Sequence, residues 1–236
     1  MPVTFIQSGR FTSAFDPTTI AGLKLWLDAS DAATITESSG AVSQWNDKSG
    51  NANHVSQATG SAQPTTGSFT QNGLNVLGFD GGDSLTGAAL AVTKPATVFA
   101  VAYVVSPAGG DKVLIHNGFV NGWMVKVNAS RWVYTKRAVA DVTDTTDTVP
   151  GSTWFQLTIT VDSSSQPGGY LDAAALTFPT NTSGITAPTT KVHVGAFDSG
   201  SQWNGRIAEM LVYDSALGTT DRTAVQSYLK SKWSTP

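Results

Sequence analysis

The chain has 236 residues, of which only 13% are charged, a formal net charge of −3, and no cysteine. This length fits one large all-β domain, and the absence of a basic stripe argues against a nucleic-acid partner. Disulfides and thiolate metal sites are excluded, so the core alone must hold the fold. No run approaches the ~18 apolar residues of a membrane-spanning helix, so membrane insertion is not expected.

The first 20 residues are predicted to form an arm that leads into a domain spanning residues 21–236. The arm mixes apolar and polar residues, and Asp16-Pro17 marks a turn at its end. The opening "MPVTFIQSGRF" has neither the basic region nor the apolar stretch of a signal peptide, so we expect synthesis in a cytoplasm without signal-directed export. Exposed apolar side chains need a partner surface, which predicts assembly contacts through Phe5, Ile6, Phe11 and Phe15.

From residue 23 onward, short apolar runs alternate with turns, which is typical of a sandwich or barrel of antiparallel strands. The run "LKLWLDA" alternates apolar and polar side chains with the period of a strand that has one buried face. The run "ATVFAVAYVV" is apolar on both faces and is predicted to be a central strand. The principal predicted strands cover residues 23–29, 74–79, 96–105, 153–162, 191–197 and 207–213.

One helix is predicted, over residues 219–233, with Thr220 as its N-cap. Its apolar side chains recur at a spacing of three to four residues, which places them on one stripe. An isolated helix of this length is marginal in water, so it must dock on the sheet or on a neighbouring chain. The stripe consists of Val225, Tyr228, Leu229 and Trp233.

Three segments in this order resemble the laminin G-like, concanavalin A-like lectin/glucanase superfamily, including its phage members. They are "LKLWLDASDAATI", then "VSQWNDKSGNANHVSQ" with "LNVLGFDGGDSLTG", and finally "WNGRIAEMLVYDSALGTTDRTAVQSYLKSKW". The resemblance implies an all-β jelly roll of two stacked antiparallel sheets with a short C-terminal α-helix. It does not imply one chemistry, because such folds carry enzymes, lectins and structural modules.

The sequence argues against a glycosidase. A retaining mechanism needs two carboxyl groups about 5–5.5 Å apart, which one strand supplies at positions i and i+2. Glu209 has Leu211 and Tyr213 at those spacings, and the other glutamate, Glu37, lies in a Ser/Gly turn. We therefore predict no enzymatic activity, and we expect Glu209 to be satisfied by a basic group or by backbone N–H groups. A polysaccharide-degrading enzyme is kept as a less favoured alternative.

Calcium is the metal that the residues and the resemblance suggest, with Asp80, Asp83 and Asp47 as candidate ligands in Gly-rich loops. In the alternative interpretation these side chains bond the backbone of their own turns. A zinc site would have to be assembled from the isolated histidines on different segments, and it is less favoured. These histidines are His54, His116 and His193.

For glycan binding, Trp123, Trp132 and Tyr134 form a candidate stacking patch if they face outward. The alternative is that these three rings pack in the core of the sandwich. Other tryptophans lie in or beside the segments that carry the resemblance and are predicted to be core or structural. These are Trp26, Trp45, Trp154 and Trp203.

The function predicted from the sequence is that of a non-catalytic bacteriophage virion protein, which decorates the capsid or sits on the tail. Its partners would be other virion proteins, further copies of itself, or both. The phage context rests on the resemblance and on the missing export signal. The alternative is a module that binds glycans on the host surface.

Overall fold

The computed structural model describes residues 15–93, 96–118, 122–136, 139–181, 190–197 and 201–236. These residues form strands, three short 3-10 turns and one α-helix. The strands pair in antiparallel fashion. The strands are β1 (Leu23–Asp28), β2 (Ile35–Ser38), β3 (Ala41–Trp45), β4 (Val55–Ser56), β5 (Thr65–Gln71), β6 (Leu74–Asp80), β7 (Leu85–Ala88), β8 (Ala96–Val104), β9 (Lys112–Asn117), β10 (Trp123–Asn128), β11 (Arg131–Lys136), β12 (Ala140–Thr143), β13 (Trp154–Val161), β14 (Pro167–Leu171), β15 (Ala174–Leu176), β16 (Lys191–Val194) and β17 (Asn204–Tyr213). The helix is α1 (Thr219–Trp233), and the 3-10 turns are η1 (Pro17–Thr19), η2 (Ala32–Thr34) and η3 (Gly60–Ala62).

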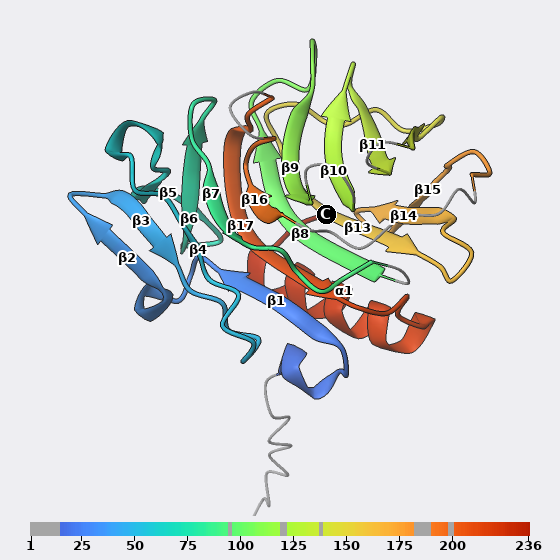
Figure 1. Ribbon diagram of the computed structural model, residues 1–236, viewed down its shortest axis with the longest axis horizontal. Helices are drawn as coiled ribbons and strands as arrows, with labels where there is room; N and C mark the ends of the chain where they lie inside the picture. Colours follow the sequence, from blue (N-terminus) through green and yellow to red (C-terminus); the bar gives the residue numbers. More distant parts are fainter. Residues whose placement is uncertain (1–14, 94–95, 119–121, 137–138, 182–189, 198–200) are drawn as a thin grey trace, which may run out of the picture.

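The pairings build two layers. In the first layer the order is β15-β14-β13-β8-β17, and both β1 and β6 pair with the other edge of β17, followed by β5. In the second layer the order is β12-β11-β10-β9-β16-β7-β4-β3-β2. A contact between β3 and β5 joins the layers. The prediction of an all-β jelly-roll sandwich with a C-terminal helix is confirmed (Figure 1).

The central strands of the first layer, β8 and β17, are mostly apolar on both faces. Along β8, Val98 and Ala100 belong to the large core between the layers, whereas Phe99 and Val101 belong to a smaller core under α1. We call the face that carries this smaller core the outer face. Because both faces of β8 are buried, apolar residues are selected at every position, which explains why the run at 96–105 does not alternate.

Helix α1 lies against the outer face (Figure 1) and buries Val225, Leu229 and Trp233 there. Its predicted bounds, 219–233, are confirmed. The predicted cap was wrong, because the helix begins at Thr219 and Gly218 is the N-cap, in extended conformation. The Arg222 N–H donates to the Gly218 carbonyl at 3.0 Å, so Thr220 already lies inside the first turn. No described helix has the length and apolar character that a membrane span requires.

Only the end of the predicted arm lies among the described residues. Asp16 caps η1 by accepting a hydrogen bond from the Thr18 N–H at 2.9 Å. Phe15 packs at 5.5 Å from the Tyr228 ring of α1, so it completes the smaller core of its own chain. Phe5, Ile6 and Phe11 lie outside the described residues, and the assembly role of the arm stays a prediction.

The close approach of β17 and β8 at Gly205 gives a test of the central pairing. A Cβ at Gly205 would lie 1.9 Å from the carbonyl oxygen of Tyr103 and 2.8 Å from Nε1 of Trp203. We expect Gly205→Ala to lower the free energy of unfolding by about 3 kcal/mol, because backbone cannot move aside as a side chain can. Urea unfolding measures this. Gly110→Ala is the control, since nothing lies within 4 Å of its Cβ position, and equal stability of the two variants would contradict the expectation.

Candidate functional site

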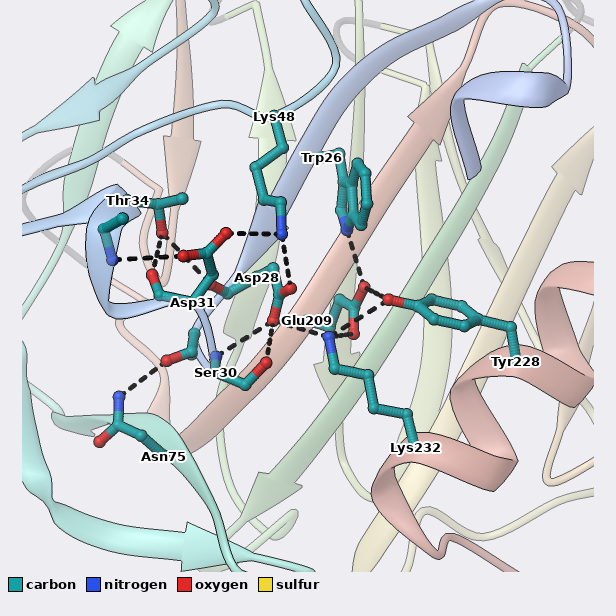
Figure 2. A network of polar contacts seen from close by, with 12 residues as sticks. Trp26, Asp28, Ser30, Asp31, Thr34, Lys48, Asn75, Glu209, Tyr228 and Lys232 are labelled. Carbon is teal, nitrogen blue, oxygen red and sulfur yellow. Dashed lines mark hydrogen bonds and ion pairs between the residues drawn. The ribbon is translucent and has the colours of Figure 1, made fainter. Parts of the chain in front are cut away.

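The carboxylate of Glu209 lies on the outer face of β17, fully buried beneath α1 (Figure 2). Two indole N–H groups donate to it, Nε1 of Trp26 at 2.7 Å and Nε1 of Trp233 at 2.6 Å. The Tyr228 hydroxyl donates at 2.7 Å and the Lys232 ammonium at 2.8 Å. Glu209 is therefore satisfied by a basic group, as the sequence predicted, although side chains rather than backbone N–H groups supply the other bonds.

A second carboxylate lies beside it on the neighbouring strand. Asp28 of β1 pairs in register with Glu209, and Lys232 Nζ lies 2.7 Å from Asp28 Oδ1. Lys48 adds an ion pair to Asp28 at 3.0 Å and another to Asp31 at 2.8 Å. Burial by itself raises the pKa of Asp28, but the charge and hydrogen bond of Lys232, with bonds from Ser30 and Lys48, outweigh it and hold that pKa below its usual value.

This carboxylate pair fits a structural role. A search for carboxylates at spacing i and i+2 on one strand could not reveal the pair, because its two members come from β1 and β17. A glycosidase acid must hold a proton and face a cleft that admits the sugar. Here Lys232 bridges both carboxylates, and the rings of Trp26, Tyr228 and Trp233 enclose Glu209. The arrangement fastens α1 to the sheet.

Helix α1 leaves part of the outer face uncovered. A β-bulge decides which residues of β17 reach this uncovered part. Between β17 and β8 the register shifts at Ala208, so that Ile207 pairs with Ala102 and Glu209 with Val101. Ile207 therefore faces the large core, and Arg206, which pairs with Tyr103, shares the outer face with Glu209. Simple alternation along the strand would assign Ile207 and Glu209 to the same face. The extra residue of the bulge breaks this alternation.

Arg206 is the centre of a row of planar groups that crosses the strands. Its guanidinium lies 4.1 Å from the ring centroid of Phe69 on one side and 4.3 Å from that of Tyr103 on the other. The Tyr103 ring contacts Trp154 of β13 at 5.8 Å. Phe69 is 38% exposed, and the other three side chains are half-buried. We call Phe69, Arg206, Tyr103 and Trp154 the outer-face row.

A glycine holds Phe69 in the row. Phe69 lies on β5, and its ring covers Gly78 of β6, where an added Cβ would meet ring carbons at 2.7 and 2.9 Å. Gly78 pairs with Arg206 on the next strand. The missing side chain at residue 78 therefore leaves the space in which the ring reaches the guanidinium.

A groove of about 490 Å³ runs beside the row, at the end of β6 and β17. Val105, which is 46% exposed, adds a second apolar side chain next to Phe69. The polar side chains along the groove are those of Ser61, Gln63, Thr65, Asp80, Asp83, Asn204 and Arg206. An exposed ring, an aliphatic side chain and hydroxyl-binding groups thus converge in one hollow, which is the usual composition of a small-ligand site.

Asp80 and Asp83 lie in the turn at the edge of this groove. The Gly82 N–H donates to Asp80 Oδ1 at 2.7 Å, and the Asp80 N–H donates to Asp83 Oδ2 at 2.8 Å. Asp83 is only 4% exposed. Burial raises its pKa to about 6, and the neighbouring Asp80 charge adds to this, although the bond from the Asp80 N–H opposes it.

The hydrogen bonds favour the alternative to calcium binding, in which these aspartates brace their own turns. Asp47 accepts hydrogen bonds from the N–H groups of Trp26, Ser49 and Asn53 at 2.8 to 2.9 Å. Within the described ranges, no group of three or more His, Asp or Glu side chains could hold a metal ion. Calcium binding through Asp47, Asp80 and Asp83 stays a prediction.

The three rings of the candidate stacking patch lie in the large core, so the alternative interpretation holds and the patch does not form. Trp123, Trp132 and Tyr134 are at most 1% exposed. Trp123 donates from Nε1 to the Val92 carbonyl at 3.0 Å, and Trp132 packs edge-on against Phe155 at 5.3 Å. Strands β10 and β11 are buried on both faces along most of their length, so no alternation marked the inward side.

The four tryptophans predicted to be core or structural differ in their burial. Trp45 and Trp203 are fully buried, as expected for core residues. Trp26 is half-buried above Glu209, and Trp154 is half-buried in the outer-face row. Among the histidines, His116 stacks on His193 at 5.4 Å, whereas His54 accepts a hydrogen bond from the Asp47 N–H at 3.0 Å in another loop.

Neither a protein-family model nor a curated protein matches this chain. Solved structures do. Trypanosoma rangeli sialidase superposes over 90% of the chain with a TM-score of 0.61 and 15% identity. The binding domain of Paraclostridial Mosquitocidal Protein 1 superposes over 94% with 0.61 and 12%, and that of botulinum neurotoxin serotype D/C over 91% with 0.58 and 13%.

This likeness shows a shared β-sandwich fold. The chain spans 33% of the sialidase and 56% and 53% of the two toxin binding domains, so it resembles one part of each of these longer proteins. The lectin-like fold expected from the sequence agrees with these matches. Membership of a phage group within that fold stays a prediction.

The structural role of Glu209 can be tested by its amide variant. We expect Glu209→Gln to lower the free energy of unfolding by about 3 kcal/mol, because it leaves buried donors aimed at a neutral group and removes one partner of the half-buried Lys232 charge. Guanidinium unfolding followed by tryptophan fluorescence measures this. The matched control is Glu37→Gln, at the chain's other glutamate, which is exposed and, among the residues that the structure describes, accepts only the Gly40 N–H. Similar losses in both variants would contradict the role of Glu209.

The raised pKa of Asp83 predicts a pH dependence of stability. Because the folded state binds this proton more tightly than the unfolded state, whose Asp titrates near 4, acidification from pH 7 to pH 5 stabilises the fold through this group. We expect the wild type to gain more stability over that interval than Asp83→Asn, in which the amide oxygen can still accept the Asp80 N–H. Urea unfolding at both pH values measures the difference, and parallel changes would contradict it.

Proposed function

We propose that the protein is a non-catalytic glycan-binding module, with its site in the groove and on the adjoining outer-face row. The observation that carries the proposal is the exposed Phe69 ring, stacked on Arg206 beside a groove lined by Asp80 and Asn204. A sugar ring has a face of C–H groups that packs on an aromatic ring and an edge of hydroxyls that bond carboxylates and amides.

The groove supplies both kinds of contact. Phe69 and Val105 are two of the three large apolar side chains that are exposed among the described residues, and both line it. Asp80 lines the groove, and the Asn204 side chain is exposed at the opposite pairing position. These groups can therefore accept from and donate to sugar hydroxyls.

The comparisons support this proposal over the virion role that the sequence suggested first. Two of the similar structures are named as toxin binding domains, and one form of the similar sialidase holds sialic acid. A non-catalytic role is supported by the closure of the Asp28–Glu209 pair under α1. A location in a virion and partners among virion proteins stay predictions, and a glycan-binding role is compatible with them.

Removal of the exposed ring tests the proposal. We expect Phe69→Ala to weaken glycan binding by about tenfold, which corresponds to about 1.4 kcal/mol, because the stacking face is lost. A glycan array identifies ligands of the wild type, and calorimetry with the best of them compares the variants.

Val139→Ala is the matched control. Val139 is 50% exposed and lies before β12, away from the groove residues. We expect this variant to bind like the wild type. If the wild type binds no glycan on the array, or if Phe69→Ala binds as well as Val139→Ala, the proposed site is wrong.

A further inference from the structure

The charge of Arg206 indicates what kind of glycan the groove accepts. Three lysines in the described part of the chain are neutralised in place. Lys48, Lys126 and Lys232 each form ion pairs with two carboxylates. Arg206 forms no ion pair with any residue that the structure describes, although it lines the groove.

The guanidinium of Arg206 hydrogen-bonds the Tyr103 hydroxyl, and its other N–H groups are left for a ligand in the groove. The ring centroids of Phe69 and Tyr103 lie 4.1 and 4.3 Å from the guanidinium carbon, and the two rings come from strands on opposite sides of β17. A guanidinium donates in its own plane, through N–H groups whose fork matches the two oxygens of an oxyanion. The rings also hold the side chain in place, which lowers the entropic cost of ordering it on binding.

The neighbouring acidic groups do not neutralise this cation. Asp80 lies two residues beyond Gly78, the cross-strand partner of Arg206, which places it roughly 7 Å away at diagonal spacing. Asp83 is buried and directed at the Asp80 N–H. The groove therefore presents a cation at one end and a hydroxyl acceptor at the other.

Resting on the glycan-binding function proposed above, we propose that the groove selects acidic saccharides. A sugar-borne oxyanion, a carboxylate or a sulfate, accepts hydrogen bonds from the Arg206 guanidinium. The ring that bears it stacks on Phe69, and its hydroxyls bond Asp80 and Asn204. Arg206 is then the specificity-determining residue, and Phe69 contributes to binding of acidic and neutral sugars alike.

Matched pairs of glycans test this inference. An array would carry neutral oligosaccharides beside their sialylated, uronic acid-containing and sulfated counterparts, together with methyl esters of the carboxylated members. We expect the wild type to bind at least one acidic glycan about tenfold more tightly than its neutral counterpart. The carboxylate and sulfate arms show which oxyanion fits, and loss of binding on methyl esterification would assign the carboxylate.

The variants separate the inference from the function on which it rests. We expect Arg206→Gln to reduce the affinity for the acidic member to that of the neutral one, and Arg206→Lys to retain only part of the preference, because a lysine lacks the planar fork. Lys191→Gln removes the same charge from an exposed position outside the groove and should leave the preference unchanged. Unfolding curves would verify that each variant is folded.

Two results would overturn the inference while leaving the proposed function intact. One is equal or tighter binding of the neutral glycans by the wild type. The other is a preference for acidic glycans that persists in Arg206→Gln. Absence of binding to every glycan would instead refute the proposed function itself.

Discussion

The structure depends on the burial of one carboxylate, that of Glu209, beneath the C-terminal helix. A buried charge is tolerated only when it is paired and hydrogen-bonded. Here the partners come from both ends of the domain, Trp26 of β1 and Tyr228, Lys232 and Trp233 of α1. Because loss of the helix would leave Glu209 without most of its donors, the interaction fixes where α1 lies on the outer face of the first layer.

The position of the helix divides that face into two regions with different roles. One region is covered, and its residues build the smaller core with Val225, Leu229 and Trp233. The other region stays open and carries the outer-face row beside the groove. A single bulge at Ala208 shapes both regions. Residues three apart on a regular strand face opposite sides, but the bulge places Glu209 and Arg206 on the same face, one under the helix and one at the groove.

The two regions also separate the chemistry that could support catalysis from the surface that could bind a sugar. The adjacent carboxylates, Asp28 and Glu209, are closed in by ion pairs, whereas the groove contains a stacked cation, an exposed ring and hydroxyl-binding groups. The same fold occurs in part of a sialidase and in toxin binding domains. Function in such a sandwich is therefore decided by which side chains the strands present on their open faces.

The sequence by itself determined the fold class, the bounds of the helix and the need of Glu209 for hydrogen-bonding partners, because these follow from local periodicity and from the cost of burying charge. It did not place Phe69, whose strand at 65–71 has few apolar residues, nor Arg206, which an unbroken alternation turns inward. It also left open whether Trp132 faces outward or packs in the core, since strands buried on both faces show no alternation. Only the tertiary structure decided these positions, because a bulge, a cross-strand neighbour such as Asp28 and the space above Gly78 depend on which strands pair.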